Sequence, residues 1–452
     1  MWADCGPSMF AYCSRDAVRH AGNPARCRLE RAQATDGRVG TIRASGGLAC
    51  CEWVELYAEC EHMKRKSLLF ALGAMAVLAA GPRTAPHVDI SLVRVPNGGI
   101  QPQVMVGRGG ILHLLYYAGD PKNGDLFYVK SPDYGSRWSA PLRVNSTPGS
   151  ALAIGTIRGG QIALGKGGRI HVAWDGSSVV QSKGPLNPEA GQKGSPMLYS
   201  RLNEGGTAFE PERSLMNHTF GLDGGGTVAA DSAGNVYVAW HGKAAGAAAG
   251  EAGRQVWIAA SRDDGATFAP EEAAWREPTG ACGCCGMSMF GDSKGVVRAL
   301  YRSATENIHR DIFLLTSLDH GRSFDGRKLY TWDINACPMS SMSFAEGAGM
   351  VAGAWETGGQ VYFENLSQPN GIPLSAPAEG KGRRHPRIAI APNGEMLMVW
   401  TEGTGWQRGG SLAWQVFGRN AKSVGDIRVQ PGVAVWRFDA VAAKPDGFVI
   451  LY

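Results

Sequence analysis

Acidic, imidazole and guanidinium side chains recur just after short apolar runs that end in Trp or Tyr. These recurring residues are Asp175, His241, Arg302, Glu356 and Glu402. Paired carboxyl groups can act as acid and base in glycosidic hydrolysis, and aromatic faces stack on sugar rings. We therefore predict acid–base roles for Asp175, Glu356 and Glu402, and substrate contacts for His241 and Arg302. The alternative is that the aromatic residues close a hydrophobic core and the polar residues are merely solvated.

Four cysteines form a second group with distinctive chemistry. The similar segments ACGCCGMSMF and ACPMSSMSF hold Cys282, Cys284, Cys285 and Cys337. The strand register predicts that the four thiols lie side by side. Three interpretations stay open, namely structural disulfides in an oxidising compartment, a soft-metal site for an ion such as Cu(I), and a reactive redox thiol. The C-x-C-C spacing is tighter than the spacing in structural zinc sites, and no cofactor is expected to be required.

The segment EGTGWQRGGSLAWQVF (402–417) presents Trp406, Gln407 and Arg408 between glycine pairs. Glycine-rich loops that carry Trp and Arg are typical of ligand contacts. We predict that Trp406 contacts a substrate. A connecting loop with one exposed aromatic residue is the alternative.

The elements that would position these residues form a repeat. An apolar strand, a glycine turn and a second apolar strand recur roughly every 50 residues. The second strands read GILHLLYY, GRIHVAW, GNVYVAW, GVVRALY, GMVAGAW, GEMLMVW and GFVILY. Short strands with glycine turns at this period are typical of propeller blades. We predict an all-β propeller of four-stranded antiparallel blades over residues 86–452, with seven blades by repeat count and six as the alternative.

The two ends of this repeat region are expected to meet. The segment HVDISLVRV (87–95) can supply an outer strand to the last blade and close the ring. In a propeller the first strand of each blade lines the axis. The loop after the second strand then lies on the face that bears the ligand site.

Composition excludes several other classes of protein. The chain has 63 Gly and 13 Trp in 452 residues, and 19% of its residues are charged. A coiled coil would be richer in Ala, Glu, Lys and Leu, and a disordered chain would have fewer aromatic residues and more charge. The net charge of +5 is spread without a long Lys/Arg run, so no nucleic-acid partner is expected.

A second motif follows the third strand of several blades. Its clean copies, SPDYGSRW, SRDDGATF and SLDHGRSF, contain Asp133, Asp263 and Asp319, and SRLNEGGTAF is a weaker copy. The Asp side chain is expected to hydrogen-bond within its own turn, while Gly supplies a positive φ. The motif resembles the Asp box (BNR repeat) of the sialidase, or neuraminidase, superfamily. The resemblance covers about residues 86–452 and implies a sialidase-like β-propeller, which in that family has six blades.

The resemblance also implies a chemistry. The family holds a substrate carboxylate with three Arg, and it uses a Tyr nucleophile activated by a Glu together with an acid/base Asp. Guanidinium groups bind carboxylates bidentately, and the axis-facing candidates for substrate binding are Arg158, Arg384, Arg387 and Arg437. The sequence departs from the family pattern, because Ile100 stands where the family has its first-strand Arg and no nucleophilic Tyr can be assigned.

The beginning of the chain carries a targeting signal. Met63-Lys64-Arg65-Lys66 precedes a short apolar stretch and small residues, so residues 63–81 are predicted to be a secretory signal peptide. We expect residues 1–62 to be a mis-assigned, disordered upstream extension. The expected location is secreted or periplasmic, with no membrane span, because the apolar stretch is shorter than the ~20 residues that a span needs.

These observations together predict a secreted, monomeric, sialidase-like propeller that binds a glycan or glycoconjugate. Exo-α-sialidase-type glycoside hydrolysis is its candidate reaction. The alternative is a non-catalytic binding scaffold, or a metal or redox propeller built around the cysteine cluster.

Overall fold

The computed structural model describes residues 88–155, 158–380 and 382–452. The predicted upstream extension (1–62) and signal peptide (63–81) lie outside the described residues. Val88–Tyr452 forms one compact unit. Its helical elements are the short 3-10 turns η2 (Pro96–Gly98), η3 (Arg108–Gly110), η4 (Lys166–Gly168) and η5 (Glu251–Gly253). In this described part of the chain, no helix is long and apolar enough to cross a membrane.

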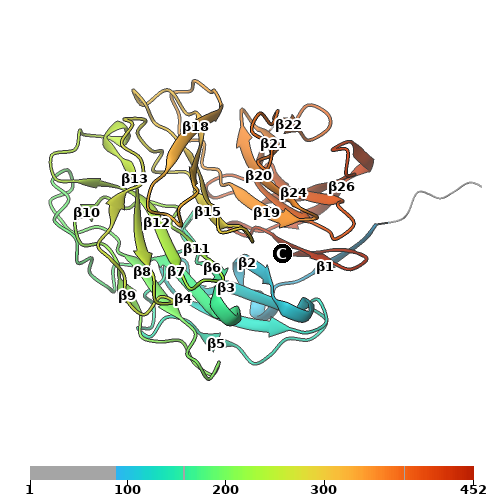
Figure 1. Cartoon of the computed structure of the whole chain (residues 1–452), viewed down its shortest axis with the longest axis horizontal. Coiled ribbons are helices and arrows are strands. Elements are labelled where there is room, and N and C mark those ends of the chain that lie inside the picture. The colour runs from blue at the N-terminus through green and yellow to red at the C-terminus, as the bar shows by residue number, and fades with distance from the viewer. Residues whose placement is uncertain (1–87, 156–157, 381) are drawn as a thin grey trace, which may run out of the picture. The chain divides into compact units, whose positions relative to one another are not determined.

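Seven β-sheets follow one another around a ring in chain order, as the colours of Figure 1 show. The first strand of each sheet lies at the centre, and the seven first strands contact one another in a closed circuit. These first strands are β2 (Ile100–Val106), β6 (Gln161–Leu164), β11 (Thr227–Ala230), β15 (Ser288–Gly291), β19 (Ser343–Gly347), β23 (Arg383–Ile390) and β27 (Ala440–Lys444). The fold is therefore a propeller with the predicted seven blades, and the alternative of six is excluded.

The second strands are the most deeply buried elements of the blades. They are β3 (Leu112–Asp120), β7 (Ile170–Asp175), β12 (Val236–Ala244), β16 (Val297–Arg302), β20 (Met350–Thr357), β24 (Met396–Glu402) and β28 (Gly447–Leu451). Strands β7 and β28 are buried at every position. A strand whose sheet is covered on both faces reads as a continuous apolar run. This explains why the repeat was visible in the sequence.

The outer strands complete the sheets and are more exposed. Six of the blades have antiparallel third strands, which are β4 (Asn123–Ser131), β8 (Met197–Arg201), β13 (Gln255–Ser261), β17 (Ile312–Ser317), β21 (Gln360–Asn365) and β25 (Gly410–Phe417). Their fourth strands are β5 (Leu142–Arg143), β9 (Arg213–Ser214), β14 (Glu272–Ala273), β18 (Asp325–Tyr330), β22 (Leu374–Ser375) and β26 (Ser423–Val433). A short extra strand, β10 (Thr219–Phe220), pairs with β12.

The seventh blade joins the two ends of the described chain. Strand β1 (Asp89–Val93) pairs with β28, as the segment 87–95 was predicted to do. The pairing is parallel and runs from Asp89 opposite Gly447 to Val93 opposite Leu451. This blade therefore has three strands and one parallel pair, where four antiparallel strands were expected. Strand β1 therefore closes the ring by pairing with a strand from the other end of the described chain. The contact between Lys444 and Asp89 spans 355 residues of sequence.

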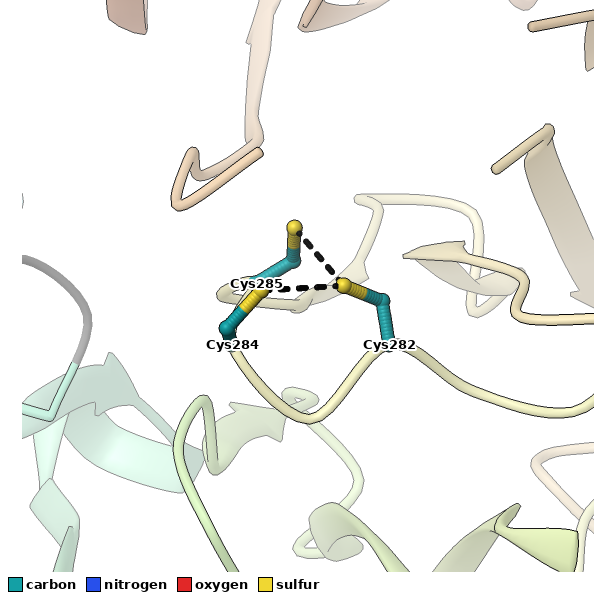
Figure 2. A group of neighbouring side chains, drawn as sticks. All are labelled: Cys282, Cys284 and Cys285. Atoms are coloured by element: carbon teal, nitrogen blue, oxygen red, sulfur yellow. Dashed lines mark hydrogen bonds between the residues drawn. The ribbon is translucent and has the colours of Figure 1, made fainter. Parts of the chain in front are cut away.

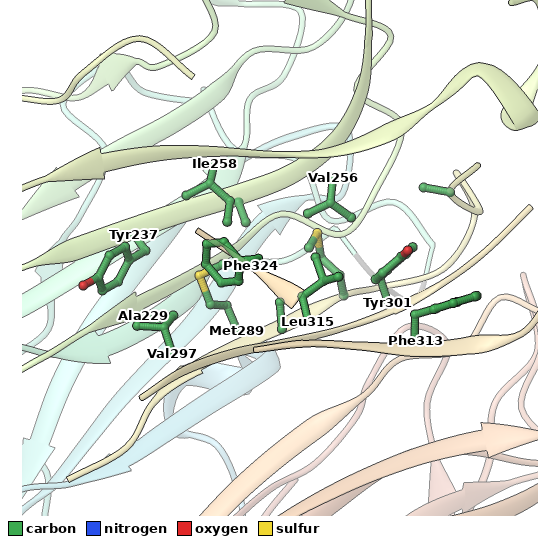
Figure 3. Close-up of a cluster of buried hydrophobic side chains, with 14 residues drawn as sticks. Ala229, Tyr237, Val256, Ile258, Met289, Val297, Tyr301, Phe313, Leu315 and Phe324 are labelled. Carbon is green, nitrogen blue, oxygen red and sulfur yellow. The ribbon is translucent and has the colours of Figure 1, made fainter. Parts of the chain in front are cut away.

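Apolar side chains fill the space between neighbouring blades. Figure 3 shows one such cluster between the third and fourth blades. Tyr237 and Val256 come from the third blade, and Met289, Leu315 and Phe324 come from the fourth. Because a blade cannot bury both faces alone, this packing between blades supplies the hydrophobic stabilisation of the fold.

The Asp turns have the predicted internal hydrogen bonds. In the third blade, Asp263 Oδ1 accepts from Ser261 Oγ at 2.7 Å and from the Thr267 backbone N–H at 2.8 Å. Although desolvation opposes the shift, these bonds lower the pKa of Asp263 to about 2. Gly265 has φ +77°. Asp133 and Asp319 make equivalent bonds, and Asn203 takes the same place in the weaker copy.

Candidate functional site

The face opposite the Asp turns carries buried polar groups at one register position. Asp175, His241, Arg302 and Glu356 each directly follow the aromatic residue of a second strand, and all four are buried. Successive strand residues point to opposite faces. The aromatic side chain therefore enters the space between blades on one side of the strand, and the polar residue points to the other side.

Glu402 does not share this position. It lies two residues after Trp400, so both side chains are on the same face of β24, and Glu402 accepts from Trp400 Nε1 at 2.9 Å and from Arg383 Nε at 3.1 Å. The residue equivalent to Glu356 is Thr401, which is buried. The sequence pattern therefore grouped Glu402 with two carboxyl groups that occupy a different register position.

Asp175 is a buried carboxyl group with an unusual protonation equilibrium. Burial raises its pKa to about 7, although the nearby Arg158 charge and a hydrogen bond from the Gly226 backbone act in the opposite direction. Its Oδ2 has no hydrogen-bond partner among the described residues. A carboxyl group in this environment holds a proton at near-neutral pH and can act as an acid.

Arg158 lies beside Asp175 and holds a second carboxylate. It donates through Nη2 to Asp223 Oδ1 and through Nε to the Asp223 carbonyl, both at 2.5 Å, and through Nη1 to the Ile154 carbonyl at 2.9 Å. The Asp223 side chain is 40% exposed, whereas that of Arg158 is 13% exposed. The pair thus presents a fixed carboxylate to solvent.

Trp406 reaches this pair from a different blade. The Arg158 guanidinium lies 5.8 Å from the centroid of the Trp406 ring, and Trp436 meets the same ring edge to face at a centroid distance of 6.4 Å. Arg158 precedes β6 of the second blade, whereas Trp406 follows β24 of the sixth. The two loops therefore meet over the centre of the ring, and Trp406 remains 40% exposed.

Glu356 and Arg302 form a second buried pair. Arg302 Nη2 lies 3.5 Å from Glu356 Oε2 and also donates to the Glu356 carbonyl. Burial raises the pKa of Glu356, while the Arg302 charge opposes the shift. Arg302 also lies 5.0 Å above the ring of Trp332. The Nη1 and Nη2 atoms of this arginine are therefore engaged within the protein, whereas its Nε has no hydrogen-bond partner among the described residues.

The four axis-facing arginines do not share one anion site. Arg158 holds Asp223, and Arg437 donates to the Gly98 carbonyl at 3.1 Å. Arg387 is half-buried, and desolvation lowers its pKa while the nearby Asp439 charge opposes the shift. Arg384 lies on β23 opposite Thr401. Its positive charge opposes the burial that raises the pKa of Glu356, and it adds to the burial that lowers the pKa of His385. With separate partners, these guanidinium groups do not form the three-arginine clamp that the resemblance implies.

Three of the four predicted cysteines form one compact group. The Sγ atom of Cys282 lies 3.2 Å from that of Cys285 and 3.4 Å from that of Cys284, and all three sulfurs lie within 4.8 Å of one another (Figure 2). None of the four cysteines is in a disulfide. Cys337 is exposed and stands outside the group. The expectation of four adjacent thiols is therefore corrected to three, and the expected disulfides between adjacent blades are not formed.

The three thiols differ in how readily they ionise. Burial of Cys285 opposes ionisation, but hydrogen bonds from Cys282 and Cys284 and the charge of Arg302 lower its pKa well below the usual range. The pKa values of Cys282 and Cys284 are raised, chiefly by the hydrogen bonds among the three thiols and by burial. Cys285 is therefore the first of the three to ionise.

Two buried histidines flank the thiols and remain neutral. Burial and the Arg254 charge lower the pKa of His241 to about 4, and its Nε2 lies 3.2 Å from the Cys285 carbonyl. Burial lowers the pKa of His385 to about 3, and its Nδ1 lies 3.1 Å from Ser341 Oγ. His385 was not singled out from the sequence, because it stands inside a first strand and not after a second one.

Several other residues of this face also escaped the sequence analysis. Connecting segments hold Asp223, Arg254 and Arg310, where no repeat position marks them. The only local signal is for Asp223, which precedes the glycine run GGG. Glycine-rich turns with an acidic residue are common ligand loops, so this signal was available in the sequence.

A cavity opens on the opposite face. It has a volume of about 820 Å³ and is lined by residues of all seven first strands, with Asp231, Asp292, Glu346, Arg387 and Lys444 among its polar residues. The carboxylates of Asp231, Asp292 and Glu346 accept hydrogen bonds from neighbouring turns. The predicted site face is therefore the end of the ring that is covered by the loops of Arg158, Trp406 and Trp436, and we call this end the capped mouth. The cavity opens at the other end, where the Asp turns lie.

The closed circuit of seven blades defines the class of this protein as a seven-bladed β-propeller. No protein-family model and no curated protein sequence matches the chain.

Similar solved structures include a protein of unknown function from Dyadobacter fermentans, with 15% identity over 72% of this chain and 96% of that one and a TM-score of 0.46. They also include a Hadza microbial sialidase (14% identity, 73% of this chain and 70% of that one, TM-score 0.42). A third is an α-L-arabinanase of Penicillium chrysogenum complexed with arabinobiose (14% identity, 75% and 94%, TM-score 0.41). At these identities the likeness is one of fold alone.

Proposed function

We propose that this protein binds a glycan at the capped mouth of the ring. The observation that carries the proposal is the platform formed by Trp406, Trp436 and Asp223 around Arg158. The two indole rings meet edge to face, and Trp406 is 40% exposed. An exposed aromatic face beside a fixed polar group is the combination that stacks on a sugar ring and hydrogen-bonds its hydroxyl groups.

The polar part of the platform favours a neutral glycan. The Nε, Nη1 and Nη2 atoms of Arg158 each already donate a hydrogen bond, to Asp223 or to the Ile154 carbonyl. The group that remains for a ligand is the Asp223 carboxylate, which is 40% exposed and accepts hydrogen bonds. Sugar hydroxyls can donate to this carboxylate, whereas an acidic sugar would be repelled by it.

The same geometry separates this proposal from sialidase-type binding. A sialic acid carboxylate needs several guanidinium groups directed at one point, and here Arg158, Arg387 and Arg437 have different partners. We therefore expect no turnover of a fluorogenic sialoside by the folded protein.

Glycoside hydrolysis is the second candidate function, and Asp175 favours it. Its carboxyl group is protonated near neutral pH, has an oxygen without a partner, and lies behind Arg158. A proton-bearing carboxyl group is what a glycosidic leaving group requires. Because Asp175 is buried, contact with a substrate requires the Arg158–Asp223 pair to move aside. Loss of turnover in Asp175→Asn, with glycan binding retained, would support this role.

The binding proposal is tested on a glycan array that carries matched neutral and sialylated oligosaccharides, followed by calorimetry. We expect binding to neutral members. We also expect a loss of affinity of about tenfold or more in Trp406→Ala, because stacked aromatic residues are the usual centres of binding energy. Trp138→Ala is the matched control, since Trp138 lies at an Asp turn on the other face.

The outcome of this experiment separates the alternatives. Folded protein that binds no glycan would overturn the proposal, and so would unchanged affinity in Trp406→Ala. Preferential binding of the sialylated members would contradict the inference of a neutral ligand.

A further inference from the structure

We propose that Cys282, Cys284 and Cys285 together bind one copper(I) ion. Nothing in the glycan proposal depends on this site. The inference rests on the placement of the three sulfurs, on the backbone that holds them, and on the buried donors around them.

The sulfur positions are close to those that a single metal ion needs. Three thiolates at about 2.3 Å from one ion lie about 3.8–4.0 Å from each other. The observed separations are 3.2 and 3.4 Å from Cys282, with all three sulfurs within 4.8 Å of one another. A disulfide needs a sulfur–sulfur distance of about 2.0 Å, and the observed separations differ more from this value than from the metal-bound one. A disulfide would also leave one of the three thiols unused.

The backbone holds the three cysteines in this arrangement before any ion binds. The Cys282 N–H donates to the Arg302 carbonyl at 2.9 Å, the Gly283 N–H to Glu251 Oε1 at 2.6 Å, and the Gly286 N–H to the Ser340 carbonyl at 2.8 Å. A Cβ atom at position 283 would lie 2.8 Å from Asp223 Oδ2 and 2.9 Å from Arg254 Nη1. A side chain at position 283 would therefore displace the ends of the Asp223 and Arg254 side chains, which pack against the loop here.

Buried donors without partners surround the thiols. Arg302 Nε and Arg254 Nε have no hydrogen-bond partner among the described residues. Arg310 is buried nearby and pairs with Glu251 Oε2 at 2.7 Å. Unpaired buried donors are costly. Three thiolates around a monovalent cation carry a net charge of −2. Such a centre would offset the free-energy cost of burying these arginine side chains.

The ligand set favours copper(I) over zinc. No His, Asp or Glu of the described chain joins the three sulfurs within the same distance. Structural zinc takes four protein ligands, and catalytic zinc takes three with an open position for water. Here Cys282 and Cys285 are only 1% and 2% exposed, so the side of the group away from Cys284 is closed to a water ligand. Thiolates select soft ions such as Cu(I), which is stable with three sulfur ligands. Cys284, which is half-buried, gives the ion a route from solvent.

Binding needs no change of oxidation state. The three thiols lose three protons to solvent, three Cu–S bonds form, and copper enters and remains as Cu(I).

The test is anaerobic titration of the reduced chain of residues 88–452, the compact unit that holds four of the ten cysteines, with Cu(I) in competition with bicinchoninate. We expect one Cu(I) per chain and X-ray absorption that shows three sulfurs at about 2.3 Å and no nitrogen ligand. The half-buried position makes Cys284→Ser the least disruptive ligand variant. We expect this variant to melt like the wild type and to lose about 100-fold or more in affinity.

Cys337→Ser is the matched control, because Cys337 is the one cysteine of this region outside the group. Its affinity for Cu(I) is expected to equal that of the wild type. Full copper affinity in folded Cys284→Ser would overturn the proposal. An equal loss in Cys337→Ser, a nitrogen ligand in the absorption spectrum, zinc bound in preference to Cu(I), or a disulfide that persists after reduction would each overturn it as well.

Discussion

Burial decides what the polar residues of this propeller can do. Asp175 and Asp439 have pKa values raised to about 7 because both are buried, although Arg158 and Arg387 oppose the shifts. His241 and His385 have lowered pKa values for the same reason. Near neutral pH the mouth of the ring thus holds carboxyl groups that are partly protonated, unlike carboxyl groups in water, and imidazoles that stay neutral even in mild acid.

The Asp175 shift predicts a specific dependence of stability on pH. Between pH 4 and 7 the native state keeps a proton on Asp175 that the unfolded state has lost. The free energy of unfolding therefore falls as the pH rises through this range. Asp175→Asn removes this contribution, so its unfolding free energy relative to the wild type should increase from pH 4 to pH 7. The shift of about three units corresponds to at most about 4 kcal/mol.

Urea unfolding at a series of pH values measures this difference. Asp426→Asn serves as the control for the substitution itself, because Asp426 is an exposed Asp. Parallel pH profiles for Asp175→Asn and the wild type would show that Asp175 is ionised in the folded protein.

At the scale of elements, the Asp turns fix the outer edge of each blade. The turn of the third blade satisfies its own backbone through Asp263, and Gly265 adopts φ +77° where a Cβ would meet the Tyr199 hydroxyl at 1.9 Å. The aromatic residue that ends the motif, Phe268, packs beside Tyr199 at a centroid distance of 4.7 Å. The motif therefore links a tight turn to the space between blades.

Substitutions in this turn should destabilise the protein in a set order. Gly265→Ala introduces both backbone strain and a steric clash, so it should lower the melting temperature the most. Asp263→Ala removes the acceptor of the Thr267 N–H and should lower it by less, because the amide can turn to water. Asp263→Asn keeps an acceptor oxygen and should lower it the least. Calorimetric melting checks the order, and a wild-type melting temperature for Gly265→Ala would contradict it.

At the scale of the whole molecule, strand β1 closes the ring. Strand β1 supplies the outer partner of β28, and Ile90 and Leu92 pack against the last hydrophobic cluster. Without β1, the edge of β28 would be open to pairing with another chain. Closure therefore couples the two ends of the described chain to the stability of every interface between blades.

A chain that starts at residue 96 should be less stable than one that starts at residue 88. We expect a lower urea midpoint and a tendency to associate, measured by fluorescence and size-exclusion chromatography. A peptide of residues 88–95 added in trans should restore the midpoint, whereas a scrambled peptide should not. Equal midpoints for the two chains would show that β1 does not contribute to closure.

The sequence alone determined the architecture of this protein. The apolar second strands, the glycine turns and the Asp turns are local patterns, and each reflects an environment that repeats in every blade. The blade number, the closing segment 87–95 and the shared position of Asp175, His241, Arg302 and Glu356 after the aromatic residues could therefore be predicted, whereas their burial was not. The departures arose where a single residue shifts the strand register, as at Thr401 and Glu402.

Only the tertiary structure decided which side chains meet at the mouth of the ring. Arg158 meets Asp223 across 65 residues of sequence, and Trp406 comes from the far side of the ring. The same holds for the thiols, because Cys337 resembles Cys282 in its sequence context but lies outside the group. Connecting loops differ in length and direction from blade to blade. Contacts across the axis therefore depend on the direction in which each loop leaves its blade in the closed ring. No local sequence pattern predicts that direction.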